Sequence, residues 1–190
     1  PSRPYYKRTQ LFKLVRGFSA VLLGKFAPAT SLGWLGVGPG SFIEEKRQQR
    51  AAATKVGLPN LETGLREYNR RIRAIATECR HRGLRCLFLT QPTMWRENLS
   101  PRERSLLWFG WVQREAQSPG YVPAAELADA METFNRELLS VCAQDGLECF
   151  DLAPLVAKDT SAFYDDAHFN ENGARIVAGL LTGYLSSKPP

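Results

Sequence analysis

Residues 79–90 read CRHRGLRCLFLT and residues 142–152 read CAQDGLECFDL, and these two stretches decide the fold class. Both contain the pattern Cys-x-x-x-Gly-Leu-x-Cys, and an apolar run accompanies the second cysteine. Glycine adopts the left-handed backbone that ends a helix, and a continuous apolar run is typical of a strand buried on both faces of a parallel sheet. The repeat predicts two helix-to-strand units of an α/β fold, with strands over residues 86–90 and 149–152.

Each predicted strand follows a helix with one apolar face. The first helix has Asn60 as its candidate N-cap, and the second opens at Pro123, a residue that suits the first turn of a helix. Gly83 and Gly146 are expected to end the two helices. The helical spacing predicts one buried stripe of Leu61, Leu65, Tyr68, Ile72, Ile75 and Cys79, and another of Leu127, Met131, Phe134, Leu138 and Cys142.

A capping box and an aromatic run lie between the two units. Residues 100–103 (SPRE) predict a helix start with proline at the first helical position. With Trp95, the aromatic side chains of this helix are expected either to wall an apolar substrate pocket or to pack in the core. Gln91 and Thr93 follow the first strand, at the sheet edge where open α/β folds build sites. The helix is expected to carry Leu106, Leu107, Trp108, Phe109 and Trp111.

The four cysteines all belong to the two repeats. Zinc ligands would need tighter pairs such as Cys-x-x-Cys, so the spacing does not indicate a metal site. We expect four buried free thiols that meet the same packing demand in both units. Local disulfides that join each helix to its strand are the alternative.

The N-terminal part of the chain is basic. Residues 1–55 contain ten Lys or Arg and two Glu, a net charge of +8, and the remaining fifteen against seventeen give −2. Residues 10–26 have the spacing of an amphipathic helix, which we expect to pack on its own domain or, alternatively, to serve as a lid or dock on an anionic membrane surface. Residues 31–41 predict a flexible glycine-rich loop, because no phosphate-binding motif is present. Residues 44–50 predict a solvated helix face.

Length and composition exclude several classes of protein. The chain has 190 residues, 44% hydrophobic and 23% charged, which suits one globular domain with a real core. We divide it into residues 1–59, an insert or lid, and residues 60–190, the main domain. No apolar run approaches the roughly 20 residues that cross a bilayer. The net charge of +6 comes with no nucleic-acid recognition motif, so nucleic acid is not an expected partner. Localisation stays open.

Residues 163–173, FYDDAHFNENG, gather two adjacent aspartates and one of only two histidines ahead of a last amphipathic helix. Asp165 precedes His168 by three residues, close enough to hold the imidazole in one tautomer. We therefore assign Asp165 and His168 as candidate catalytic residues. Asp166 is a lesser candidate for the orienting carboxylate and is expected to face water. His81, between two arginines at a helix end, is expected at the surface.

The motif Asp165-x-x-His168, after the second strand and before a helix opened by Asn170 and Gly173, resembles the last block of the SGNH (GDSL-type) hydrolase family. The resemblance covers residues 60–188. It implies a three-layer α/β/α sandwich with a parallel sheet, flavodoxin-like, and ester hydrolysis by a Ser-His-Asp triad. In that triad His168 would be the general base and Asp165 its orienting partner.

The sequence departs from the family in lacking the Gly-Asp-Ser block, the oxyanion-hole glycine and the Gly-x-Asn-Asp block. The family's block order places the nucleophile upstream of Pro1, where we also expect the further strands that a stable sheet needs. Ser41 is a poor substitute, because it lacks a strand-turn-helix context. The resemblance implies a small-molecule, lipid or carbohydrate ester as substrate and no metal or cofactor. The alternative is a non-catalytic SGNH-like domain that binds a membrane surface or a protein partner through residues 10–26.

Overall fold

A computed structural model describes residues 41–114 and 117–188 of the chain. The chain divides into two compact units, residues 1–46 and residues 47–190. The helix expected over residues 10–26 and nearly all of the glycine-rich loop lie outside the described residues. The described elements, in order, are α2 (Ser41–Ala52), α3 (Glu62–His81), β1 (Leu87–Leu89), α4 (Pro101–Leu106), β2 (Trp111–Arg114), β3 (Gln117–Tyr121), α5 (Ala124–Asp145), β4 (Glu148–Phe150), the short 3-10 helix η4 (Ala153–Leu155) and α6 (Glu171–Ser187).

The two predicted strands pair with each other in parallel, which confirms the α/β class. Leu87 lies opposite Glu148, and Leu89 lies opposite Phe150. Both strands are shorter than expected, and their side chains are half-buried rather than buried on both faces. The reason is that this sheet has only two strands among the described residues, so each strand keeps one edge without a neighbouring strand there.

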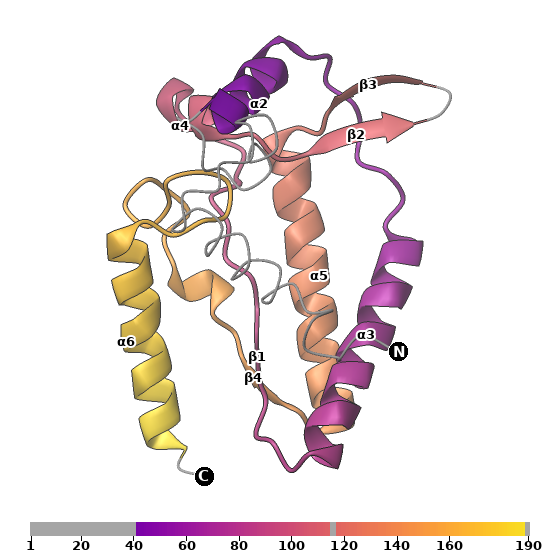
Figure 1. Cartoon of the computed structure of the whole chain (residues 1–190), viewed down its shortest axis with the longest axis vertical. Coiled ribbons are helices and arrows are strands. Elements are labelled where there is room, and N and C mark those ends of the chain that lie inside the picture. Colours follow the sequence, from indigo (N-terminus) through magenta and orange to yellow (C-terminus); the bar gives the residue numbers. More distant parts are fainter. Residues whose placement is uncertain (1–40, 115–116, 189–190) are drawn as a thin grey trace, which may run out of the picture. The chain divides into compact units, whose positions relative to one another are not determined.

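Helices cover both faces of this pair. Figure 1 shows α3 and α5 on one side of β1 and β4, and α6 on the other. Side chains alternate accordingly, because successive residues of a strand point to opposite faces. Phe88 and Cys149 pack into the cluster formed by α3 and α5, whereas Leu89 and Phe150 pack into the second cluster, to which α6 contributes. The Phe150 and Tyr184 rings are 4.7 Å apart and join β4 to α6.

The predicted helix ends are largely confirmed. The N-cap of α3 is Leu61, one residue later than expected, although Asn60 accepts a hydrogen bond from the backbone N–H of Glu62 at 2.7 Å. Gly83 and Gly146 both have φ of 62°, the left-handed backbone that follows a helix. One member of the predicted stripe differs: Ile75 is 54% exposed, and the neighbouring Ala76 is buried in its place.

The capping box also forms, but the helix that it opens is shorter than expected. Ser100 and Glu103 exchange both hydrogen bonds of the box, at 3.2 and 2.8 Å. The helix α4 then ends at Leu106 instead of continuing through the aromatic run. Trp108 and Phe109 leave the helical path because a buried carboxylate accepts their backbone N–H groups, and Gly110 turns the chain at φ of 92°. The chain continues into the antiparallel hairpin β2–β3, which the sequence analysis did not predict.

The expectation of free thiols is wrong, and the alternative of local disulfides is correct. Cys79 is bonded to Cys86 and Cys142 to Cys149, with 6.2 Å between the Cα atoms of each pair. No cysteine of the chain is free. Each disulfide joins the last turns of a helix to the neighbourhood of the next strand. A glycine turn lies between the two cysteines and brings the chain back toward the helix end, which places both side chains within bonding distance.

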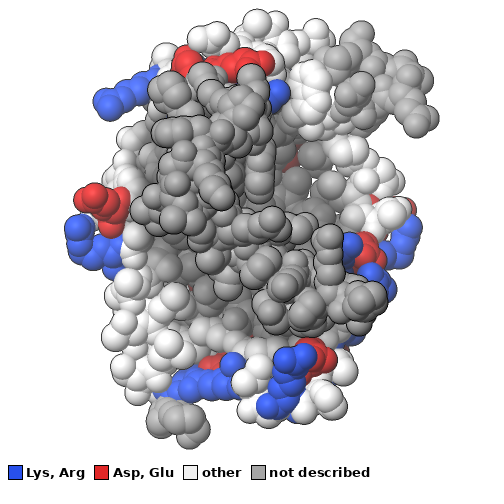
Figure 2. Space-filling view, in the orientation of Figure 1, with Lys and Arg blue, Asp and Glu red and all other residues white. Residues whose placement is uncertain are grey.

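Several charged side chains on the surface of the second unit form ion pairs. Figure 2 shows basic and acidic groups side by side at the edges of the visible face. In the second unit, Arg85 pairs with Glu148 at 2.7 Å, and Arg73 pairs with Asp145 at 2.8 Å. His81 is exposed, as expected. None of the described helices combines the length and apolar character that a bilayer span needs.

Candidate functional site

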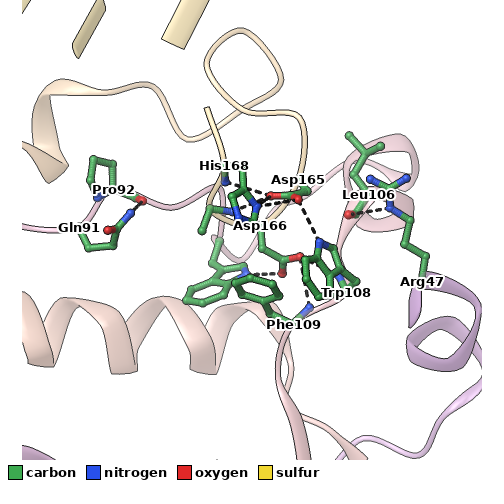
Figure 3. A network of polar contacts seen from close by, with 11 residues as sticks. Arg47, Gln91, Pro92, Leu106, Trp108, Phe109, Asp165, Asp166 and His168 are labelled. Atoms are coloured by element: carbon green, nitrogen blue, oxygen red, sulfur yellow. Dashed lines mark hydrogen bonds and ion pairs between the residues drawn. The ribbon is translucent and has the colours of Figure 1, made fainter. Parts of the chain in front are cut away.

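The predicted pair Asp165 and His168 forms, in the loop that precedes α6. Nδ1 of His168 lies 2.9 Å from each carboxylate oxygen of Asp165. The loop is closed on itself: Phe163 and Phe169 form an antiparallel bridge, and the backbone N–H of Tyr164 donates to the carbonyl of His168 at 3.1 Å. The short Asp-x-x-His spacing therefore produces a turn in which the carboxylate faces the imidazole (Figure 3).

The start of α6 anchors this loop. The side chain of Asn170 accepts a hydrogen bond from the backbone N–H of Gly173 at 2.8 Å and is the N-cap of the helix. Gly173 packs directly on the backbone of Ala162, so closely that a Cβ atom at this position would lie 2.0 Å from the carbonyl oxygen of Ala162. Asn170 thus holds the loop against the helix through its N-cap hydrogen bond, and Gly173 does so because it has no Cβ atom to prevent the close contact.

Asp165 is fully buried and hydrogen-bonded at both oxygens. Oδ1 accepts backbone N–H groups of Ala167 at 3.1 Å and of His168 at 3.0 Å, and Oδ2 accepts the indole N–H of Trp108 at 3.0 Å. Burial raises the pKa of Asp165, but the hydrogen bonds from Trp108, His168 and Ala167 outweigh it and hold the pKa below its ordinary value. The carboxylate stays ionised and keeps Nδ1 of His168 as a hydrogen-bond donor.

The imidazole of His168 is half-exposed, with a side chain that is 49% accessible, so one edge of the ring reaches solvent. Three aromatic rings surround it. The ring lies nearly parallel to those of Trp108, at 6.3 Å between centroids, and Tyr164, at 5.6 Å, and nearly perpendicular to that of Phe109, at 5.9 Å. Among the described residues, no hydrogen bond occupies Nε2.

The expectation that Asp166 faces water is wrong, because its side chain is completely buried. It accepts the indole N–H of Trp95 at 2.7 Å and the backbone N–H groups of Trp108 at 2.6 Å and Phe109 at 3.2 Å. Burial raises the pKa of Asp166 above its ordinary value, although these donors and the charge of Arg50 oppose the shift. Asp166 makes no hydrogen bond with the imidazole, so Asp165 is the carboxylate that holds His168 directly.

A pocket of about 380 Å³ lies at the carboxyl ends of the two strands. Gln91 and Thr93 contribute from the loop after β1, as the sequence analysis expected, and Asp151 contributes from the end of β4. The hydroxyl of Thr90 donates to Asp151 at 2.7 Å and accepts the backbone N–H of Ala153 at 2.8 Å, which fixes the two strand ends to each other. Helix α5 supplies the other wall through Ala128, Met131, Glu132, Asn135, Arg136 and Leu139.

The structure does not bring a nucleophile to His168 among the side chains that it describes, those of residues 42–112 and 120–188. No serine hydroxyl of these residues is hydrogen-bonded to the imidazole, and Ser41 is the first residue of α2. Among the same residues, no group of three or more His, Cys, Asp or Glu side chains is arranged to hold a metal ion.

Three site residues escaped the sequence analysis in their actual roles. Trp95 and Trp108 were treated as pocket walls or core, yet both donate indole N–H groups to the buried carboxylates. Arg50, which the sequence predicts on a solvated helix face, donates to the backbone carbonyl of Val122 at 3.0 Å and to that of Phe109. Tryptophan N–H groups need partners when buried, but these aspartates lie 57 and 71 residues away in the sequence, so no local signal pointed to them.

No protein-family model, curated protein or solved structure matches this chain.

Proposed function

We propose that this chain provides the acid–base half of an ester hydrolase of SGNH type. The observation that carries the proposal is the pair formed by the buried, ionised Asp165 and the half-exposed His168, with 2.9 Å between Nδ1 and the carboxylate. This is the arrangement that orients the histidine of a Ser-His-Asp triad, with one ring nitrogen held by the carboxylate and the other directed to the reaction.

The fold supports the same proposal. A parallel strand pair with helices on both faces is compatible with a flavodoxin-like α/β/α sandwich. The histidine loop follows the last strand and precedes a helix, as in the SGNH block that the sequence resembles. The pocket at the carboxyl ends of the strands lies where open α/β folds bind their ligands, but neither Asp165 nor His168 lines it, so the proposal rests on the pair and not on this pocket.

In the proposed reaction, Nε2 of His168 takes the proton from a serine hydroxyl as the oxygen attacks the ester carbonyl. The imidazolium that forms is stabilised by Asp165, and it gives the proton to the leaving alcohol. Water then hydrolyses the acyl-serine, again with His168 as the base. The serine is contributed by a segment upstream of Pro1. The chain alone is therefore expected to have negligible esterase activity, since the nucleophile and the oxyanion donors account for most of the rate.

The test uses a reading frame extended upstream of Pro1 and p-nitrophenyl acetate as the substrate. His168→Ala should lower kcat by roughly three orders of magnitude or more, because it removes the general base of the triad. Asp165→Asn should lower kcat by a similar amount, since it favours the wrong tautomer. His81→Ala removes the other histidine, which is exposed, and is the matched control that should leave kcat unchanged.

Two results would contradict the proposal. One is turnover by the extended protein that survives His168→Ala. The other is turnover by the 190-residue chain itself that disappears in His168→Ala, which would mean that the chain already contains the nucleophile. A fluorophosphonate probe, which reacts with activated serines, should label the extended protein and not the chain alone.

A further inference from the structure

The buried carboxylate of Asp166 has no part in the proposed reaction, yet it lies directly beside the one that does. Both Asp165 and Asp166 are 0% exposed. Two adjacent carboxylates without solvent are costly unless each is fully hydrogen-bonded. Such costs are concentrated at functional sites, where a buried charge holds another group in place. The contacts of Asp166 show which group it holds.

Asp166 connects three segments that are distant in the sequence. Its Oδ1 accepts the indole N–H of Trp95 at 2.7 Å, and its Oδ2 accepts the backbone N–H groups of Trp108 and Phe109 at 2.6 and 3.2 Å. Its backbone carbonyl accepts the N–H of Met94 at 2.9 Å. The loop after β1, the segment after α4 and the histidine loop therefore meet at this one residue (Figure 3).

Both backbone polar groups of Phe109 are hydrogen-bonded. Its N–H donates to Asp166, and its carbonyl accepts a hydrogen bond from Arg50. The same guanidinium donates to the carbonyl of Val122 at 3.0 Å. The positive charge of Arg50 also offsets part of the cost of burying Asp166. The backbone that carries Trp108 is thus fixed on both sides.

The fixed backbone directs the Trp108 side chain at the catalytic pair. Its indole N–H reaches Oδ2 of Asp165 at 3.0 Å, and its ring lies within 6° of parallel to the imidazole of His168. We propose that Asp166 is a positioning residue, which acts through Trp108 to hold Asp165 in the orientation that binds Nδ1 of His168. The catalytic importance of this relay rests on the proposed function, but its structural effect on His168 does not.

The experiment measures proton exchange in the 190-residue chain by 1H–15N NMR. A histidine Nδ1 proton held by a carboxylate exchanges slowly with water, and each indole N–H gives its own signal. The chain has two histidines and four tryptophans, so the signals are few. Asp166→Asn keeps the shape but breaks the relay at its start, and Trp108→Phe keeps an aromatic ring but removes the N–H. Asp129→Asn removes one charge from an exposed position on α5 and is the matched control.

In Asp166→Asn, exchange of both the Trp108 indole proton and the His168 Nδ1 proton should become about tenfold faster, the change expected for the loss of one net hydrogen bond. In Trp108→Phe, the His168 proton should respond likewise. Asp129→Asn should change neither. Unaltered exchange of the His168 proton in either Asp166→Asn or Trp108→Phe would overturn the proposal, and if Asp166→Asn does not fold, Trp108→Phe decides alone.

This readout separates the relay from the proposed function. A slowly exchanging His168 proton that is insensitive to Asp166→Asn would overturn the relay only. The absence of such a proton in the unsubstituted chain would count against the Asp165–His168 pair itself, and so against the proposed hydrolase and the relay together. Loss of esterase turnover is not needed for either conclusion.

Discussion

Replacing Gly173 by alanine tests how tightly the histidine loop is anchored to α6. A Cβ atom at residue 173 would lie 2.0 Å from the carbonyl oxygen of Ala162 and 2.8 Å from its carbonyl carbon. Carbon–oxygen contacts are normally no shorter than about 3.3 Å, so one backbone segment must move by more than about 1 Å. That movement also stretches the hydrogen bond from Asn170 N–H to the Ala162 carbonyl, which is 3.0 Å long.

Overpacking against backbone costs about 1–3 kcal/mol, and the weakened hydrogen bond about 1 kcal/mol more. We therefore expect Gly173→Ala to lower the free energy of unfolding by about 3 kcal/mol. For a domain of this size that corresponds to a fall in Tm of roughly 6–12 °C.

Gly179→Ala is the matched control, on the same helix. Nothing lies within 4 Å of a Cβ atom at residue 179. Alanine is favoured over glycine in a helix interior by roughly 0.5–1 kcal/mol, so this substitution should raise the Tm slightly. Thermal unfolding followed by circular dichroism measures both variants. A Gly173→Ala variant that unfolds at or above the Tm of Gly179→Ala would refute the close-contact argument.

Two further predictions concern the second unit as a whole. Each disulfide spans a sequence separation of 7, and closing so short a loop stabilises a fold by about 2.5 kcal/mol in the loop-entropy model. Reduction of both disulfides should therefore lower the free energy of unfolding by about 5 kcal/mol. Urea titrations with and without reductant measure this, and equal unfolding midpoints would contradict it. Glu103 has its pKa lowered from 4.5 to about 2, mainly by its hydrogen bond with Arg96. The ion pair of Glu103 with Arg96 therefore contributes fully to the free energy of unfolding above pH 4.5, and this contribution is lost as the pH falls toward 2. Glu103→Gln should make the stability of the protein depend less on pH in this range, and an unchanged stability–pH curve would count against the ion pair.

The elements predicted correctly from sequence depend on local rules. Asn60 and Gly83 act through residues only a few positions away, so their effect can be read from a short window. The same holds for Asp165 and His168, whose contact needs a turn of three residues. The α/β class followed from two such windows, because each helix-to-strand unit is a local structure.

The errors arose where contacts join distant segments. The chain leaves the helix after Leu106 because Asp166, 58 residues beyond Trp108, accepts the Trp108 backbone N–H. The helix propensity of residues 101–111 depends on these residues alone and cannot indicate so distant a partner. Likewise, Arg50 is partly buried because carbonyls 59 and 72 residues away accept its N–H groups.

The disulfides are a different kind of error, since their signal was local. Two cysteines separated by a helix-ending glycine turn return to the same place, and the 6.2 Å between their Cα atoms is within bonding range. The identical spacing in both repeats was attributed to packing. Both repeats have the same turn with a cysteine on each side of it, and this arrangement favours a disulfide over two free thiols.

Neither disulfide joins the first half of the chain to the second, so the backbone is the only covalent connection between the two halves. Each closes a loop within one half of the chain, before residue 114 or after residue 117. The candidate site is built from both halves: Trp95 and Trp108 from the first, Asp165, Asp166 and His168 from the second. The Asp165–His168 pair of the second half therefore packs against tryptophans of the first half. We predict that the two halves, prepared as separate peptides, associate when mixed, and that a slowly exchanging His168 proton appears only in the mixture.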